Sequence, residues 1–79
     1  MTNQTFRLNG ESVRVIRELR GYRPSALATR AEIDPGYLTK IENGQRQPSP
    51  AVLHRLAAAL AVPLTAITYP VTIIESKAA

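Results

Sequence analysis

The side chains that most often carry catalysis and metal binding are scarce in this chain. Its 79 residues include no cysteine, one histidine and six acidic residues, which are scattered along the sequence. Without cysteine there is no disulfide, thiol chemistry or thiolate metal site, and the scattered acids form no ligand cluster. The lone histidine, His54, stands beside Arg55, as expected of a surface residue. The sequence therefore predicts a protein that is not an enzyme and uses neither a metal nor another cofactor.

Arginine is the abundant charged residue of this chain, and it can bind anions. Ten basic and six acidic residues give a net charge of +4. Segment 7–30 alone accounts for that surplus, because its six arginines are opposed only by Glu11 and Glu18. The six are Arg7, Arg14, Arg17, Arg20, Arg23 and Arg30. Localised positive charge suits a polyanion such as nucleic acid, although charge alone fits an ordinary solvated helix face equally well.

Two short helical patterns, separated by a tight break within residues 23–44, are the elements that would position such a surface. Proline is favoured at the first position of a helix, because the N–H group that it lacks would have no partner within the helix there. Pro24 therefore predicts a helix over 24–31. A second helix is predicted over 35–43, with Asp34 as its N-cap and Gly44 as the residue that ends it. This second helix carries a thin apolar stripe, so most of its surface should be exposed.

Three further helices are predicted around this pair: residues 11–20, a helix that begins at Pro50 after a Ser49 cap, and a short turn over 64–68. On the first of these, Val13, Ile16 and Leu19 fall on one apolar stripe. Short strands are expected over Thr5–Leu8 and in a strand-like tail over 71–75, where β-branched residues follow Pro70.

No repeat, linker or low-complexity segment divides the chain, so a single domain over residues 1–79 is expected, with a helical core over about 11–68. No apolar run approaches the ~18 residues of a membrane span. The N-terminus also lacks the basic-then-apolar pattern of a secretory signal. The expectation is a cytoplasmic protein that does not enter the membrane.

The stretch Arg23–Gly44 resembles the helix-turn-helix of the phage repressor and Cro (XRE-like) family, and the likeness extends over Val13–Ile67. It rests on an ordered set of residues rather than on one decisive motif. The matching residues are Leu27, Ala28, Ile33, Leu38, Ile41, Glu42, Asn43, Gly44, Arg46, Pro48 and Ser49. The resemblance implies a mainly α, five-helix repressor-like domain in which helix 35–43 lies in the DNA major groove.

The same resemblance assigns the DNA contacts. Positions that read base edges are held by Gly36, Tyr37 and Lys40. Positions that contact the DNA backbone, alone or together with bases, are held by Arg23, Ser25, Thr39, Asn43 and Arg46. Three alternatives remain open: a packing role for Tyr37, a merely solvated Arg23, and a minor-groove contact for Arg46.

Four positions depart from the family pattern. Pro24 stands where a Gln is usual, and Pro35 and Gly36 remove two side chains that often read bases. Glu32 occupies a turn position that is usually Gly, so it either adopts a positive φ at a cost of about 1–2 kcal/mol or the turn has shifted.

The resemblance also implies a structural salt bridge between Arg17 and Glu42. If it is partly buried it would orient helix 35–43, and the alternative is two exposed charges worth under about 1 kcal/mol.

The function that the resemblance implies is sequence-specific DNA binding by a transcriptional regulator. It would repress by occupying an inverted-repeat operator as a homodimer. The partner surface is expected in the tail Val71–Ile74, which would pair with a partner's tail. The same tail could instead pair with Thr5–Leu8 of its own chain or be disordered, and the helices after Ser49 are the other route to a dimer. Alternatives are a restriction–modification controller protein, an autoregulating antitoxin, or a protein–protein adaptor that uses the same helices.

Overall fold

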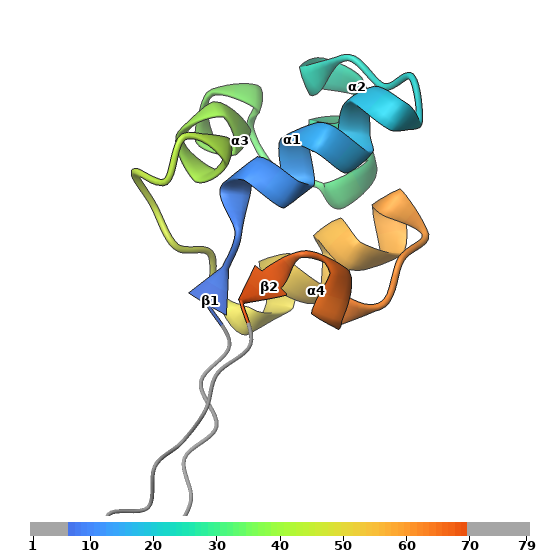
Figure 1. Ribbon diagram of the computed structural model, residues 1–79. Coiled ribbons are helices and arrows are strands. Elements are labelled where there is room, and N and C mark those ends of the chain that lie inside the picture. The colour runs from blue at the N-terminus through green and yellow to red at the C-terminus, as the bar shows by residue number, and fades with distance from the viewer. Residues whose placement is uncertain (1–6, 70–79) are drawn as a thin grey trace, which may run out of the picture.

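The computed structural model describes residues 7–69, in which four α-helices precede a single 3-10 turn and two short strands pair. The elements in chain order are β1 (Arg7–Leu8), α1 (Gly10–Leu19), α2 (Pro24–Ala31), α3 (Pro35–Glu42), α4 (Pro50–Leu60), η1 (Leu64–Ala66) and β2 (Thr68–Tyr69). In Figure 1, α1, α2 and α3 group together in the upper part of the view, with α4 and the two strands beneath them. Within the described range, no helix is long and apolar enough to cross a membrane.

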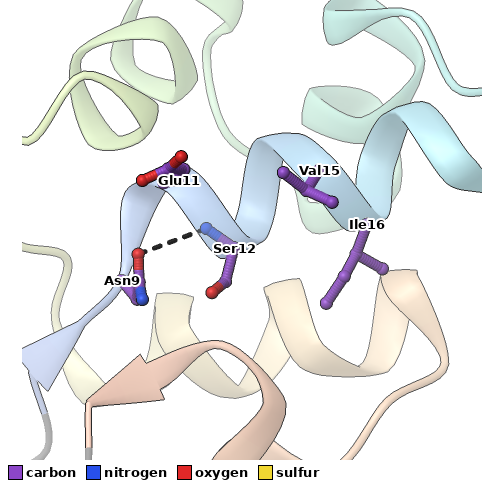
Figure 2. Close-up of a pocket in the computed structure, with 5 residues that line it drawn as sticks. All are labelled: Asn9, Glu11, Ser12, Val15 and Ile16. Carbon is purple, nitrogen blue, oxygen red and sulfur yellow. Dashed lines mark hydrogen bonds between the residues drawn. The ribbon is translucent and has the colours of Figure 1, made fainter.

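Local capping explains where the helices begin. The Asn9 side chain accepts a hydrogen bond from the Ser12 N–H at 3.2 Å, which satisfies one of the free N–H groups at the start of α1 (Figure 2). Ser49 does the same for Val52 at the start of α4, at 3.3 Å. The predicted Ser49 cap is confirmed. The helix predicted over 11–20 begins and ends one residue earlier.

The core is built from aliphatic side chains of the four helices, joined by one residue each from β1 and from the link between η1 and β2. The side chains with the largest fully buried volumes are Val13, Leu27, Leu38, Ile41, Leu56, Leu60 and Ile67. The buried residues of α3 are Leu38 and Ile41 alone, so the thin apolar stripe predicted for this helix is confirmed.

The stripe predicted on α1 is wrong at its last position, because Leu19 is 79% exposed. The buried residues of α1 are Gly10, Val13 and Arg17, and Ile16 is half-buried on the side that faces α4 (Figure 2). An arginine takes the inward position because a carboxylate on α3 is there to receive it.

The prediction of five helices is also wrong. Residues Leu64–Ala66 form one 3-10 turn, and Thr68, expected to be helical, lies in a strand. The Thr68 hydroxyl donates to the Leu64 carbonyl at 3.1 Å, and Asn9 N–H donates to the Ile67 carbonyl at 2.8 Å. These bonds close the turn and draw the chain against β1, so no further helical turn follows.

The two strands pair antiparallel, with Arg7 opposite Tyr69 and Leu8 opposite Thr68. The strand predicted near the N-terminus is thus confirmed at Arg7–Leu8. The Gln47 side chain joins β1 as well: its oxygen accepts from the Leu8 N–H at 3.0 Å and its nitrogen donates to the Leu8 carbonyl at 3.5 Å. The predicted tail strand over 71–75 lies outside the described residues.

The crossing of α1 over α3 depends on the absence of a side chain at Gly10. A Cβ atom built on Gly10 would lie 2.3 Å from the Ile41 carbonyl oxygen and 2.6 Å from that of Glu42. Both oxygens belong to the backbone of α3, so they cannot move aside without moving the helix.

We expect Gly10→Ala to push α1 and α3 apart and to lower the free energy of unfolding by about 1–3 kcal/mol, the usual cost of overpacking. Urea denaturation measures this change. Gly36→Ala is the matched control, because its new Cβ would meet only the Asp34 side chain, at 3.0 Å, and it should change stability by less than about 1 kcal/mol. Equal effects at the two sites would contradict the assignment.

Candidate nucleic-acid interface

A tight turn joins α2 to α3. Glu32 adopts φ 59° and ψ 44°, the left-handed region, so the turn has not shifted to spare a non-glycine residue. Glu32 N–H donates to the Thr29 carbonyl at 3.1 Å and Ile33 N–H to that of Ala28 at 2.9 Å, which satisfies the last carbonyls of α2. This geometry costs about 1–2 kcal/mol, and the rest of the fold sustains it.

Helix α3 is fixed at both ends. The Asp34 carboxylate accepts from Gly36 N–H at 2.8 Å and from Tyr37 N–H at 3.3 Å, so the predicted cap is confirmed. At the other end Gly44 has φ +79°, and its N–H donates to the Ile41 carbonyl at 3.1 Å. The left-handed glycine turns the chain away after Glu42, one residue before the predicted end.

The three predicted base readers differ in their exposure. Gly36 and Lys40 are exposed on α3, one turn apart, whereas Tyr37 is half-buried and packs against the core. Thr39 is exposed too, and its hydroxyl donates to the Pro35 carbonyl at 3.2 Å, leaving its oxygen lone pairs available. Lys40 is therefore the one long, exposed and charged side chain among the three.

The residues expected at the DNA backbone lie at the two ends of the α2–α3 pair. Arg23 precedes α2 and makes no side-chain capping bond, and Ser25 is exposed in the first turn. Asn43 and Arg46 are exposed where the chain leaves α3. Helix N-termini and exposed arginines are suited to phosphate groups. The arrangement can therefore present hydrogen-bond donors on both sides of the outer face of α3.

Arg17 and Glu42 fix the orientation of α3 from inside. Arg17 Nε lies 2.8 Å from Glu42 Oε2, and its Nη2 lies 3.2 Å from Oε1, which is a bidentate contact. The two side chains are only 9% and 7% exposed. A third bond runs from Arg17 Nη1 to the Tyr22 carbonyl at 3.0 Å. One guanidinium thus joins α1, α3 and the link to α2.

Half of the arginines in segment 7–30 serve the fold. Besides Arg17, Arg20 donates from Nε to the Leu60 carbonyl at 2.9 Å, at the end of α4. The Arg30 guanidinium lies 4.7 Å above the centre of the Tyr22 ring. Of these six arginines, Arg7, Arg14 and Arg23 are exposed and outside such contacts within residues 7–69. The interpretation of the whole segment as a polyanion surface was therefore too broad.

Of these three, only Arg23 was predicted as a residue of the candidate interface, and Arg14 is a residue that the structure adds to it. Arg14 on α1 lines the same surface hollow as Asn43 and Gly44 at the end of α3. No short-range pattern could reveal this, because only tertiary packing brings α1 beside the end of α3.

Comparison with known proteins finds similar helix-turn-helix proteins. The model of the Helix-turn-helix family matches residues 13–67. The chain is 37% identical over 67 residues to the HTH-type transcriptional repressor RghR of Bacillus subtilis (strain 168), a match that covers 84% of this chain and 50% of RghR. It therefore spans about half the length of that curated relative.

Solved structures resemble it as well. The restriction-modification controller protein C.AhdI from Aeromonas hydrophila aligns with a TM-score of 0.70 and 30% identity, over 72% of this chain and 86% of that one. SinR, the master regulator for biofilm formation, solved in complex with DNA, aligns with a TM-score of 0.68 and 32% identity, over 72% and 94%. The N-terminal DNA binding domain of SinR from Bacillus subtilis aligns with a TM-score of 0.66 and 32% identity, over 70% of this chain and 81% of that one.

Glu42→Gln should lower the free energy of unfolding by about 3–5 kcal/mol, because it leaves the Arg17 charge buried and unpaired. Glu32→Gln is the matched control: Glu32 lies 3.9 Å from Arg55 and its side chain is 78% exposed, so the same change should cost under about 1 kcal/mol. Urea denaturation of both variants measures the two changes in the free energy of unfolding. A small loss for Glu42→Gln would mean that the pair does not hold α3.

Proposed function

The chain belongs to the Helix-turn-helix family of DNA-binding transcriptional regulators, and from this premise we propose that it represses transcription by occupying operator DNA, in the manner of a phage repressor or Cro protein. Members of this family are not enzymes. One observation carries the proposal: α3 is capped at both ends and pinned from inside, yet its outer face is exposed. Such a rigid, exposed helix suits the major groove, which is wide enough to admit it.

Base readout in this proposal rests mainly on Lys40. Its ammonium can donate to guanine O6 and N7 in the major groove. Gly36 has no side chain to read a base, so it instead lets the α3 backbone approach the DNA closely. Tyr37 is half-buried, so it contributes from the edge of the contact. Specificity then combines few direct contacts with the sequence-dependent shape of the DNA.

Affinity in this proposal comes from phosphate contacts on both sides of α3. Arg23 and Ser25 would hold one phosphate at the start of α2, and Asn43 and Arg46 another beyond α3. Thr39 would touch a phosphate or a base from the helix itself. These contacts fix register and orientation, and they carry little sequence information.

We further propose that two copies act together on an inverted repeat. One α3 reads only half a site, and two-fold related copies place their helices about 34–36 Å apart, one turn of DNA. Two surfaces suit the partner: the segment Val71–Ile74, which follows β2 in the chain, and the surface of α4 and η1. The Leu8 edge of β1 is less suitable, because Gln47 already occupies it. Such a protein would work in the bacterial cytoplasm or nucleoid, where the DNA lies.

A second candidate function is that of a restriction–modification controller. The observation that favours it is the likeness to C.AhdI, which covers 86% of that chain. The two candidates share the DNA-binding surface and differ in the genes that they regulate. Mapping the enriched operator separates them, because a controller's site should adjoin the genes for a restriction enzyme and its methyltransferase.

Selection of genomic DNA fragments by the purified protein tests the proposal. We expect an enriched inverted repeat. Lys40→Ala should relax the preference at one base position in each half-site, with a loss of about 1–3 kcal/mol in discrimination. Arg23→Gln should instead weaken binding evenly across sequences and reduce the log–log salt slope by about 0.9 for each phosphate that the variant no longer neutralises.

Two outcomes would contradict this proposal. Salt-sensitive binding with no enriched sequence would indicate a non-specific DNA-binding protein without an operator. No retention of DNA even at low salt would instead favour an adaptor that binds a protein through the same helices.

A further inference from the structure

The exposed side of α3 ends at a hollow of which the contacts proposed so far use only Asn43. Gly36 and Lys40 lie one turn apart on α3. Asn43 and Gly44 follow where the chain leaves the helix. Those two residues line an open hollow of about 390 Å³ whose other walls come from the start of α1 and from β2. A duplex lying along α3 would therefore pass over this hollow at the C-terminal end of the helix.

The wall formed by α1 is held in place by contacts already described. Gly10 lines the hollow and packs directly on the α3 backbone, and Arg17 clamps Glu42 further along α1. Arg14 lies between these two contacts in the sequence, and its side chain also lines the hollow. Its position relative to Asn43 is thus set by the rigid α1–α3 crossing.

The charges around the hollow favour an anion. Within residues 7–69, Arg14 makes neither an ion pair nor a side-chain hydrogen bond, although Glu11 and Glu18 are close in sequence. Of the two carboxylates in the walls, Glu42 is neutralised by Arg17, which leaves Glu11 as the opposing charge.

A second cation borders the same hollow. Tyr69 lines it, and Arg7 is the cross-strand partner of Tyr69. Directly opposed residues in an antiparallel pair project from the same face of the sheet. Arg7 is exposed and does not itself line the hollow, so it lies at the margin beside Tyr69.

We propose that this hollow takes a phosphodiester of the DNA that α3 contacts, held by Arg14 with Asn43, and with Arg7 and Tyr69 at its margin. The inference rests on the proposed function and extends it. The contact surface would reach past α3 onto α1 and the strands, and Arg14 would be a phosphate-binding residue. Glu11 opposes the phosphate, so its charge would limit the strength of the contact.

Fluorescence anisotropy with a labelled duplex of mixed sequence, titrated at several salt concentrations, tests the proposal, because phosphate contacts do not depend on sequence. Arg14→Gln should weaken binding and lower the log–log salt slope by about 0.9. Arg14→Lys should restore most of that slope. Glu11→Gln should act in the opposite direction and tighten binding.

Leu19→Glu is the matched control, since it lowers the net charge by one, as Arg14→Gln does, at a side chain of α1 that is 79% exposed and does not line the hollow. At physiological salt a charge acts over about 8 Å, so this variant should bind like the parent protein. Thermal melts followed by circular dichroism check that each variant is folded. Arg14 is exposed, so its replacement should leave the melting temperature unchanged.

The outcomes separate this inference from the proposed function. If the parent protein binds DNA and Lys40→Ala relaxes its specificity, but Arg14→Gln keeps the parent affinity and slope, the hollow is not a phosphate site and the operator-binding proposal stands. Equal losses for Arg14→Gln and Leu19→Glu would also overturn the inference, since net charge would then explain both. If the parent protein binds no DNA at any salt concentration, both proposals fail.

Discussion

The buried ion pair between Arg17 and Glu42 is the interaction on which the arrangement of this molecule depends. It joins α1 to α3 through two hydrogen bonds, and a third bond ties the same guanidinium to the carbonyl of Tyr22. Desolvating two charges cancels much of their attraction, so such a pair adds little net stability compared with apolar residues of the same volume. Its contribution is geometric: a planar guanidinium with three fixed partners permits one orientation of α3 and penalises any other. The close approach at Gly10 acts in the same direction, because the two backbones can meet at only one distance.

The remaining arginines show why positive charge is an imprecise guide to a binding surface. Arg20 donates to the carbonyls of Leu60 and Ala61 at the end of α4, and Arg55 donates to the Ala31 carbonyl at the end of α2. Helix C-termini expose carbonyl groups and carry partial negative charge, so cations are favourable there. In this small domain, Arg20 and Arg55 thus tie the C-terminal end of one helix to a neighbouring helix. The charge left to meet a polyanion is correspondingly smaller and is confined to fewer positions.

The sequence could predict the features that depend on interactions between residues close together in the chain. The bounds of α2 and α3 depend on Pro24, Asp34 and Gly44, whose effects act within one helical turn, and those predictions were right to within a residue. The outward position of Leu19 and the strand that begins at Thr68 were missed, because packing of α1 on α3 and the pairing of β1 with β2 are long-range contacts. The candidate site divides in the same way. The exposed residues of α3 could be named from the pattern, but the place of Arg14 beside the end of α3 depends on a helix crossing that no local pattern encodes.

The composition of α3 bears on how specificity could arise. The family resemblance places base-reading side chains at the positions of Pro35 and Gly36, which carry none here. Tyr37 is half-buried, so Lys40 is the one long exposed side chain among the proposed readers. A good side-chain contact to a base discriminates by about 1–3 kcal/mol, whereas operator proteins bind their sites about 4–10 kcal/mol more tightly than other DNA. One copy of this chain therefore falls short of that range on direct readout alone.

Two copies on an inverted repeat would double the free energy contributed by direct readout. A rigid α3, set at one angle and braced by phosphate contacts at both ends, would make the energy of deforming the DNA depend on its sequence. The loss of readers on α3 thus makes the fixed helix orientation and the proposed two-fold assembly more important for specificity.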